Sequence, residues 1–127
     1  MPCLIDTNVL IDALTGHVSA TVLTRIDNAI ADKTRYSVIT RMELLGWSGH
    51  TAESRRATQA LLTQLTEVNL TPAIVAMVID IRSTITIKLP DAIIAASALA
   101  ENLPLMTRNT KDFNRIEGLV LVDPFVG

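Results

Sequence analysis

PCLIDTNVL, residues 2–10, changes from the continuous apolar run of a strand to the spacing of a helix. The apolar run ends at Ile5 and is followed by Asp6-Thr7-Asn8. Beyond this point apolar residues recur at helical intervals, at Val9, Leu10, Ala13 and Leu14, until Gly16. The stretch therefore predicts a buried strand that passes directly into a helix, with an aspartate at the junction.

Strand-like and helix-like segments alternate along the rest of the chain. We expect strands at residues 36–39, 68–70, 104–107 and 119–122, and helices at residues 22–30, 73–81 and 92–100. Two further helices, residues 40–46 and 57–65, are expected to form a hairpin around the turn residues 47–51. Short connections between alternating strands and helices are typical of a parallel sheet covered on both faces. The sequence thus predicts an α/β fold: one three-layer α/β/α domain, residues 1–127, with a short, mainly parallel central sheet.

Two helix starts carry specific signals. Thr40-Arg41-Met42-Glu43 has the form of a capping box, so a helix is expected to begin at Thr40. Thr71 places a capping hydroxyl before Pro72, which suits the first position of a helix.

The composition excludes several classes of protein. Hydrophobic residues make up 49% of the chain, but the longest apolar runs, residues 74–79 and 92–96, are far shorter than the roughly 20 residues that cross a bilayer. The amino end lacks the basic start of a signal peptide, so we expect a cytoplasmic protein. A single cysteine, Cys3, excludes an internal disulfide and a cysteine-clustered metal site.

The net charge of -2 comes from 11 basic and 13 acidic residues. A basic surplus is the usual sign of a nucleic-acid partner. If four acidic residues are metal ligands, the remaining nine are outnumbered by the 11 basic ones. The charge balance then permits RNA binding without predicting it.

Four acidic residues fall where predicted strands end and helices begin: Asp6, Glu43, Asp91 and Asp112. In open parallel sheets these ends meet at one edge, where ligands bind. Each residue also has an ordinary structural interpretation. Asp6 is suited to cap a helix, and Glu43 to complete the capping box. Asp91 suits the positive end of a helix dipole, and Asp112 suits a turn with Asn109.

Taken together, the four carboxylates would place like charges near one point, which is costly unless cations neutralise them. An all-oxygen cluster without cysteine or histidine favours a hard ion, Mg²⁺ or Mn²⁺. Such ions serve phosphodiester hydrolysis by generating hydroxide and stabilising the attacking and leaving oxygens. The sequence therefore predicts a metal-dependent nuclease.

The motifs resemble those of the PIN domain family, and most closely its VapC toxins of bacterial and archaeal toxin–antitoxin pairs. The resemblance is carried by Asp6-Thr7-Asn8, Thr40-Arg41-Met42-Glu43-Leu44, Lys88-Leu89-Pro90-Asp91-Ala92-Ile93-Ile94-Ala95-Ala96, and Leu105-Met106-Thr107-Arg108-Asn109-Thr110-Lys111-Asp112-Phe113. It implies a Mg²⁺- or Mn²⁺-dependent endoribonuclease that inhibits translation and growth. Its catalytic and metal-binding residues would be Asp6, Glu43, Asp91 and Asp112. Asn8 and Thr107 match polar positions that orient a carboxylate, a water or the substrate phosphate.

The resemblance also implies partners: an RNA substrate, a second copy of the chain and a small antitoxin that covers the active-site groove. The helices at residues 73–81 and 92–100 are apolar on nearly all sides, so they are either central core or partner surface. Trp47 either anchors an antitoxin segment or packs over the hairpin.

Other side chains are less informative. Arg82 and Arg108 either contact RNA phosphates or pair with nearby acidic residues. His17 and His50 lie outside the acidic motifs and are expected on the surface.

Two other functions remain open from the sequence. One is a phosphoryl-transfer domain with Asp6 as nucleophile, although Asn8 stands where haloacid-dehalogenase-like phosphatases have a second aspartate. The other is a module that keeps the fold but only binds a partner.

Overall fold

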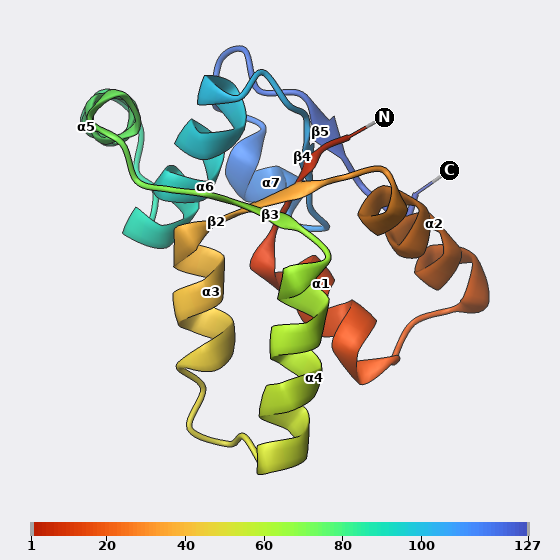
Figure 1. The fold of residues 1–127 in the computed structure, drawn as a ribbon. Helices are drawn as coiled ribbons and strands as arrows, with labels where there is room; N and C mark the ends of the chain where they lie inside the picture. The colour runs from red at the N-terminus through yellow and green to blue at the C-terminus, as the bar shows by residue number, and fades with distance from the viewer. Residues whose placement is uncertain (1, 127) are drawn as a thin grey trace.

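A parallel sheet of five strands forms the centre of the computed structural model, which describes residues 2–126 (Figure 1). The strands are β1 (Leu4–Ile5), β2 (Arg35–Ser37), β3 (Thr66–Val68), β4 (Leu105–Met106) and β5 (Leu121–Val122). Their order is β3-β2-β1-β4-β5, and the pairings between neighbours are all parallel. From β1 the chain adds β2 and then β3 on one side, and it then crosses to the other side of β1 to add β4 and β5. This reversal is the point where open α/β sheets bind ligands.

Helices cover both faces of the sheet. They are α1 (Thr7–Thr15), α2 (Ala20–Ala31), α3 (Val38–Leu45), α4 (Ala52–Thr63), α5 (Pro72–Thr84), α6 (Leu89–Ala100) and α7 (Thr110–Phe113). Leu4 packs in a core cluster with residues of α5, α6 and α7, whereas Ile5 packs in a second cluster with residues of α1, α2 and α4. Successive strand residues point to opposite faces, so the sheet separates two cores. The predicted three-layer α/β/α fold is confirmed.

The predicted helical hairpin is also confirmed. α3 and α4 contact each other and extend together below the sheet in the view of Figure 1. Thr51 caps α4 by accepting a hydrogen bond from the amide of Ser54. His50, expected on the surface, is half-buried at the tip, where its ring nitrogens lie 2.8 Å from Ser54 Oγ and 2.6 Å from the Leu44 carbonyl oxygen.

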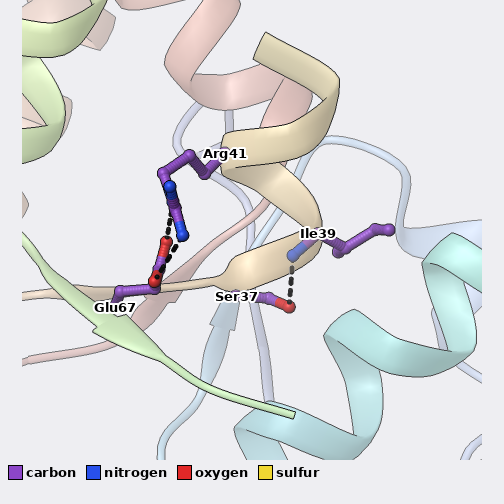
Figure 2. Close-up of polar contacts among 4 residues, drawn as sticks. All are labelled: Ser37, Ile39, Arg41 and Glu67. Atoms are coloured by element: carbon purple, nitrogen blue, oxygen red, sulfur yellow. Dashed lines mark hydrogen bonds and ion pairs between the residues drawn. The ribbon is translucent and has the colours of Figure 1, made fainter. Parts of the chain in front are cut away.

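The start of α3 differs from the prediction. Ser37 is the N-cap, and its hydroxyl accepts a 3.2 Å hydrogen bond from the amide of Ile39 (Figure 2). The capping box predicted at Thr40 is therefore wrong, and the strand expected over residues 36–39 ends at Ser37. The physical reason is that the helix already begins at Val38, so Thr40 lies within its first turn, where its buried hydroxyl contacts Thr7 instead.

Other boundaries shift by a few residues. β3 ends at Val68, where a strand was expected to begin, and α5 continues to Thr84. The predicted cap of α5 is confirmed, because Thr71 Oγ1 accepts from the amide of Ile74 at 3.2 Å. No helix within residues 2–126 has the length and apolar character needed to cross a membrane.

The two apolar helices have different environments. Residues 92–98 of α6 are buried throughout, so this helix is central core. α5 buries Ile74, Val78 and Ile81, but its outer side leaves Val75 and Ile79 41% and 65% exposed. Of these two helices, α5 is therefore the one with an apolar outer side.

Candidate active site

Asp6 lies at the junction of β1 and α1, as predicted, and is only 4% exposed. Its Oδ1 accepts a 2.8 Å hydrogen bond from the Thr7 amide, so the carboxylate does cap α1. Its Oδ2 accepts a 2.9 Å hydrogen bond from the hydroxyl of Thr107, which follows β4. The strand reversal between β1 and β4 thus fixes both oxygens of Asp6 in place.

Glu43 reaches the same edge from α3. Its Oε1 accepts a 2.8 Å hydrogen bond from Thr7 Oγ1, and Thr7 Oγ1 also lies 2.9 Å from Thr40 Oγ1. Thr7 has one hydroxyl proton, which it donates to Glu43, so Thr40 must donate to Thr7. This relay of hydroxyls positions Glu43 against α1 and replaces the capping box predicted from the sequence.

Arg41, two residues before Glu43 on α3, forms an ion pair. Arg41 donates to Glu67 of β3, with Nη2 3.2 Å from Oε2 (Figure 2). Residues two apart on a helix do not share a face, so Arg41 and Glu43 point in different directions. Arg41 therefore holds α3 against the sheet and stays apart from the acidic residues.

Asp91 and Asp112 come from two further helices. Asp91 lies in the first turn of α6, and Asp112 lies in α7, the short helix that follows β4. Asp112 is exposed and accepts a 2.6 Å hydrogen bond from Asn109 Nδ2, so its predicted pairing with Asn109 is present. Both aspartates line one cavity of about 420 Å³.

The charges of the four carboxylates act on one another. Burial raises the pKa of Asp6, and the nearby charges of Asp91 and Glu43 raise it further. Hydrogen bonds from Thr107 and Thr7 offset part of this rise in the Asp6 pKa. Burial likewise raises the pKa of Asp91, followed by repulsion from Asp112 and Glu43, while Lys88 lowers it. Asp6, Glu43, Asp91 and Asp112 are therefore near enough to influence one another's charge, and we call their surroundings the acidic region.

The donor set fits a hard cation that keeps part of its water shell. Among residues 2–126, no group of three or more His, Cys, Asp or Glu side chains lies close enough together to hold a metal ion by itself. Magnesium typically binds to one or two carboxylates, several waters and a substrate phosphate rather than to a closed protein cage. The all-oxygen donors present fit such an ion only if waters and a phosphate supply the remaining ligands.

A second cavity borders Glu43. It has a volume of about 630 Å³ and lies against α1, α3 and α4. Its lining is mainly apolar and includes Ile11, Leu14, Leu44, Trp47, His50 and Ala57. We call it the hairpin groove. The acidic region therefore lies between this groove, which Glu43 lines, and the cavity lined by Asp91 and Asp112.

Trp47 packs over the tip of the hairpin, with its ring against Gly49, but it is not buried. It is 60% exposed and meets His50 edge to face, with ring centroids 5.2 Å apart.

Arg108 pairs with an acidic residue, which was one of its two predicted roles. Its Nη1 lies 3.3 Å from Asp12 Oδ1, and its guanidinium lies over the ring of Phe125.

Sequence reasoning missed two positioning residues, Thr7 and Thr40. Thr7 stands inside the Asp6-Thr7-Asn8 motif, in which the sequence predicts a role for Asn8; Asn8 is exposed, whereas Thr7 is buried. Burial of Thr7 would follow from its place one residue after a buried aspartate at a helix start. The contact with Glu43 would not, because it spans 36 positions and depends on how α3 crosses α1.

Comparisons with known proteins agree with this geometry. The PIN domain family model matches residues 3–119. A chain of a toxin–antitoxin complex from Klebsiella pneumoniae is 33% identical, with a TM-score of 0.79 over 96% of this chain and 97% of the other. A chain of VapBC-1 from nontypeable Haemophilus influenzae is 27% identical, with a TM-score of 0.84 over 99% and 100%.

A more distant match supports the fold alone. It is a chain of DNA-bound VapBC from Salmonella typhimurium, 20% identical, with a TM-score of 0.85 over 98% of each chain. No curated protein sequence matches the chain significantly. The family model covers most of the sequence, and the solved structures align along almost its full length. The chain therefore belongs to the PIN domain family, and its resemblance to VapC-type toxins is confirmed.

Proposed function

We propose that the protein is a cytoplasmic endoribonuclease that hydrolyses RNA phosphodiester bonds with Mg²⁺ or Mn²⁺ held by Asp6, Glu43, Asp91 and Asp112. The observation that carries this proposal is the placement of these carboxylates around the strand reversal, where burial first, and then the charges of the other carboxylates, raise the pKa values of Asp6 and Asp91. A protein accepts such a cluster when a cation offsets it. When bound, the ion supplies the charge that lowers the pKa of water and stabilises the attacking and leaving oxygens.

The protein's own residues hold and orient the side chains of the acidic region. Asp6 is rigid, because Thr107 and the Thr7 amide hold both of its oxygens. Glu43 is oriented by Thr7, and Asp91 and Asp112 face the cavity through which an RNA strand reaches the acidic region. Asn8, exposed in the first turn of α1, is assigned the orientation of a water or phosphate.

The test is cleavage of a mixed-sequence RNA by the purified protein in EDTA, Mg²⁺ or Mn²⁺. We expect cleavage only with the metal ions, and its loss in Asp91→Asn, which removes a ligand charge. Asp80→Asn, which changes an exposed aspartate on α5, is the matched control and should cut normally. Metal-independent cleavage, or equal activity of Asp91→Asn and the control, would overturn the proposal.

The geometry bears on the two alternatives. Asp6 is 4% exposed and both of its oxygens accept hydrogen bonds, which constrains a nucleophilic Asp6 and a metal-bound Asp6 alike. Trapping a phosphoryl-aspartate at Asp6 would nevertheless replace the nuclease assignment. A chain that folds and binds a partner but cuts no RNA under any metal condition would be a binding module.

We assign the protein the role of toxin in a toxin–antitoxin pair, inhibiting translation and growth. Support comes from its 33% identity to a chain of the Klebsiella pneumoniae toxin–antitoxin complex. The hairpin groove is the site assigned to a small antitoxin, because it is apolar, borders Glu43 and exposes Trp47. Expression of the chain alone should arrest bacterial growth, and Asp91→Asn should relieve the arrest.

A homodimer is proposed through α5. Val75 and Ile79 lie one turn apart on the outer side of this helix and are both exposed. An exposed apolar face of this kind favours self-association. Light scattering should give the mass of a dimer for the wild type and of a monomer for Ile79→Glu; a monomeric wild type would contradict the dimer.

A further inference from the structure

The cavity beside Asp91 and Asp112 carries three cations as well as two acids. Its lining residues are Arg82, Thr86, Ile87, Lys88, Asp91, Asp112 and Arg115, and its volume is about 420 Å³. Among residues 2–126, none of the three cations forms an ion pair with a carboxylate. Basic side chains next to acids ordinarily pair with them, so the charges of these cations are not neutralised by a direct ion pair.

The segment between α5 and α6 holds two of the cations in place. Arg115 Nη2 donates a 2.8 Å hydrogen bond to the Thr86 carbonyl, and Arg82 Nε donates a 3.3 Å hydrogen bond to the Ile87 carbonyl. A guanidinium has five N–H donors, so most of the donors on each arginine stay available. The side chains are exposed, but their backbone anchors keep both beside the same short loop.

Lys88 completes the cluster at the start of α6. It is the N-cap residue of this helix, and because its ammonium only donates hydrogen bonds, its side chain does not cap the helix amides. Its ammonium is close enough to Asp91 to act on the charge of that carboxylate. The positive end of α6 and the three side chains therefore point to an anion next to the acidic region.

An RNA strand needs this compensation. Four carboxylates repel the phosphates that flank the cleavage site, and cations beside them restore attraction. We propose that Arg82, Lys88 and Arg115 form a binding site for a phosphate of the RNA strand that neighbours the bond cut at the acidic region. The proposal rests on the proposed function for its ligand, but binding at the site requires no cleavage.

The experiment measures binding of a fluorescent, mixed-sequence, 12-nucleotide RNA to the full chain in EDTA over a series of KCl concentrations. Each phosphate contact on a single strand contributes a slope of about -0.7 to the dependence of log affinity on log salt. We expect Lys88→Gln and Arg115→Gln each to weaken binding and to reduce the magnitude of the slope by about 0.7. Arg115→Lys, which keeps the charge, should restore the slope.

The matched control is Arg56→Gln, which removes an exposed cation of α4 that does not line the cavity. Its slope should equal that of the wild type. Equal slopes for the wild type, Lys88→Gln and Arg115→Gln, with thermal melting unchanged, would overturn the phosphate site. A reduced slope in a protein that cuts no RNA would instead keep the phosphate site and reject the nuclease.

Discussion

The hydroxyl of Thr107 donates a 2.9 Å hydrogen bond to Oδ2 of Asp6, which stands 101 positions earlier in the sequence. Both residues follow strands that lie side by side in the sheet, β4 and β1. The bond therefore links the two halves of the fold at the strand reversal. It also fixes the most deeply buried carboxylate of the acidic region.

Thr107→Val should destabilise the protein. Valine keeps the shape of the side chain but leaves Oδ2 of buried Asp6 without its donor, at a cost of about 1–3 kcal/mol in the free energy of unfolding. Urea denaturation at pH 7 measures this change, and Thr107→Ser, which keeps the hydroxyl, should stay close to the wild type. Equal stability of the valine variant and the wild type would show that the bond does not contribute.

Thr7→Val tests the hydroxyl relay. The substitution removes the hydrogen bond that orients Glu43, so we expect RNA cleavage to fall by about 10–100-fold, as for partners of metal ligands. Thr7→Ser should cut nearly as well as the wild type because it retains the donor. If valine and serine gave the same rate, Glu43 would not depend on Thr7.

The ion-free protein should lose stability as the pH rises. Burial raises the pKa of Asp6, and burial and neighbouring acids raise that of Asp91, so both groups bind protons more tightly in the folded state. Their favourable contribution is complete below the unfolded aspartate pKa of about 3.9 and is lost as the pH passes through the raised values.

Urea denaturation in EDTA, at pH values from below about 3.9 upward through the raised pKa values, measures this loss of stability. Asp91→Asn has one fewer of these groups, so its stability should fall less than that of the wild type. Adding Mg²⁺ should stabilise the wild type most at the upper end of the range. An identical pH dependence in both proteins would contradict the raised pKa of Asp91.

Trp47 reports on the hairpin groove. It is the only tryptophan of the chain and is 60% exposed, so its fluorescence should shift to shorter wavelength when an antitoxin segment covers it. Trp47→Ala should weaken antitoxin binding by at least tenfold, as expected for a central aromatic anchor. Unchanged affinity in the variant would place the antitoxin elsewhere.

The sequence predicted the fold class because its signals were local. The apolar strand before Asp6 and the long apolar helix after Asp91 each determine their own structure from adjacent residues. The positions of Asp6, Asp91 and Asp112 at strand and helix ends followed from the same signals. The expectation that they converge rests on the general geometry of parallel sheets.

The misassigned capping box had a different cause. Ser37 and Thr40 are both able to cap a helix, and only the end of the strand at Ser37 decides between them. Once Thr40 lies inside α3, its hydroxyl becomes a buried contact of Thr7. Such contacts depend on the crossing of two helices, which no local pattern encodes.

Calorimetric titration with Mn²⁺ tests most directly whether Asp6, Glu43, Asp91 and Asp112 together bind a divalent ion. The wild type should bind the ion with measurable heat, Asp91→Asn at least tenfold more weakly, and Asp80→Asn as well as the wild type. No uptake of Mn²⁺ by the wild type, or equal uptake by all three proteins, would contradict binding by these carboxylates.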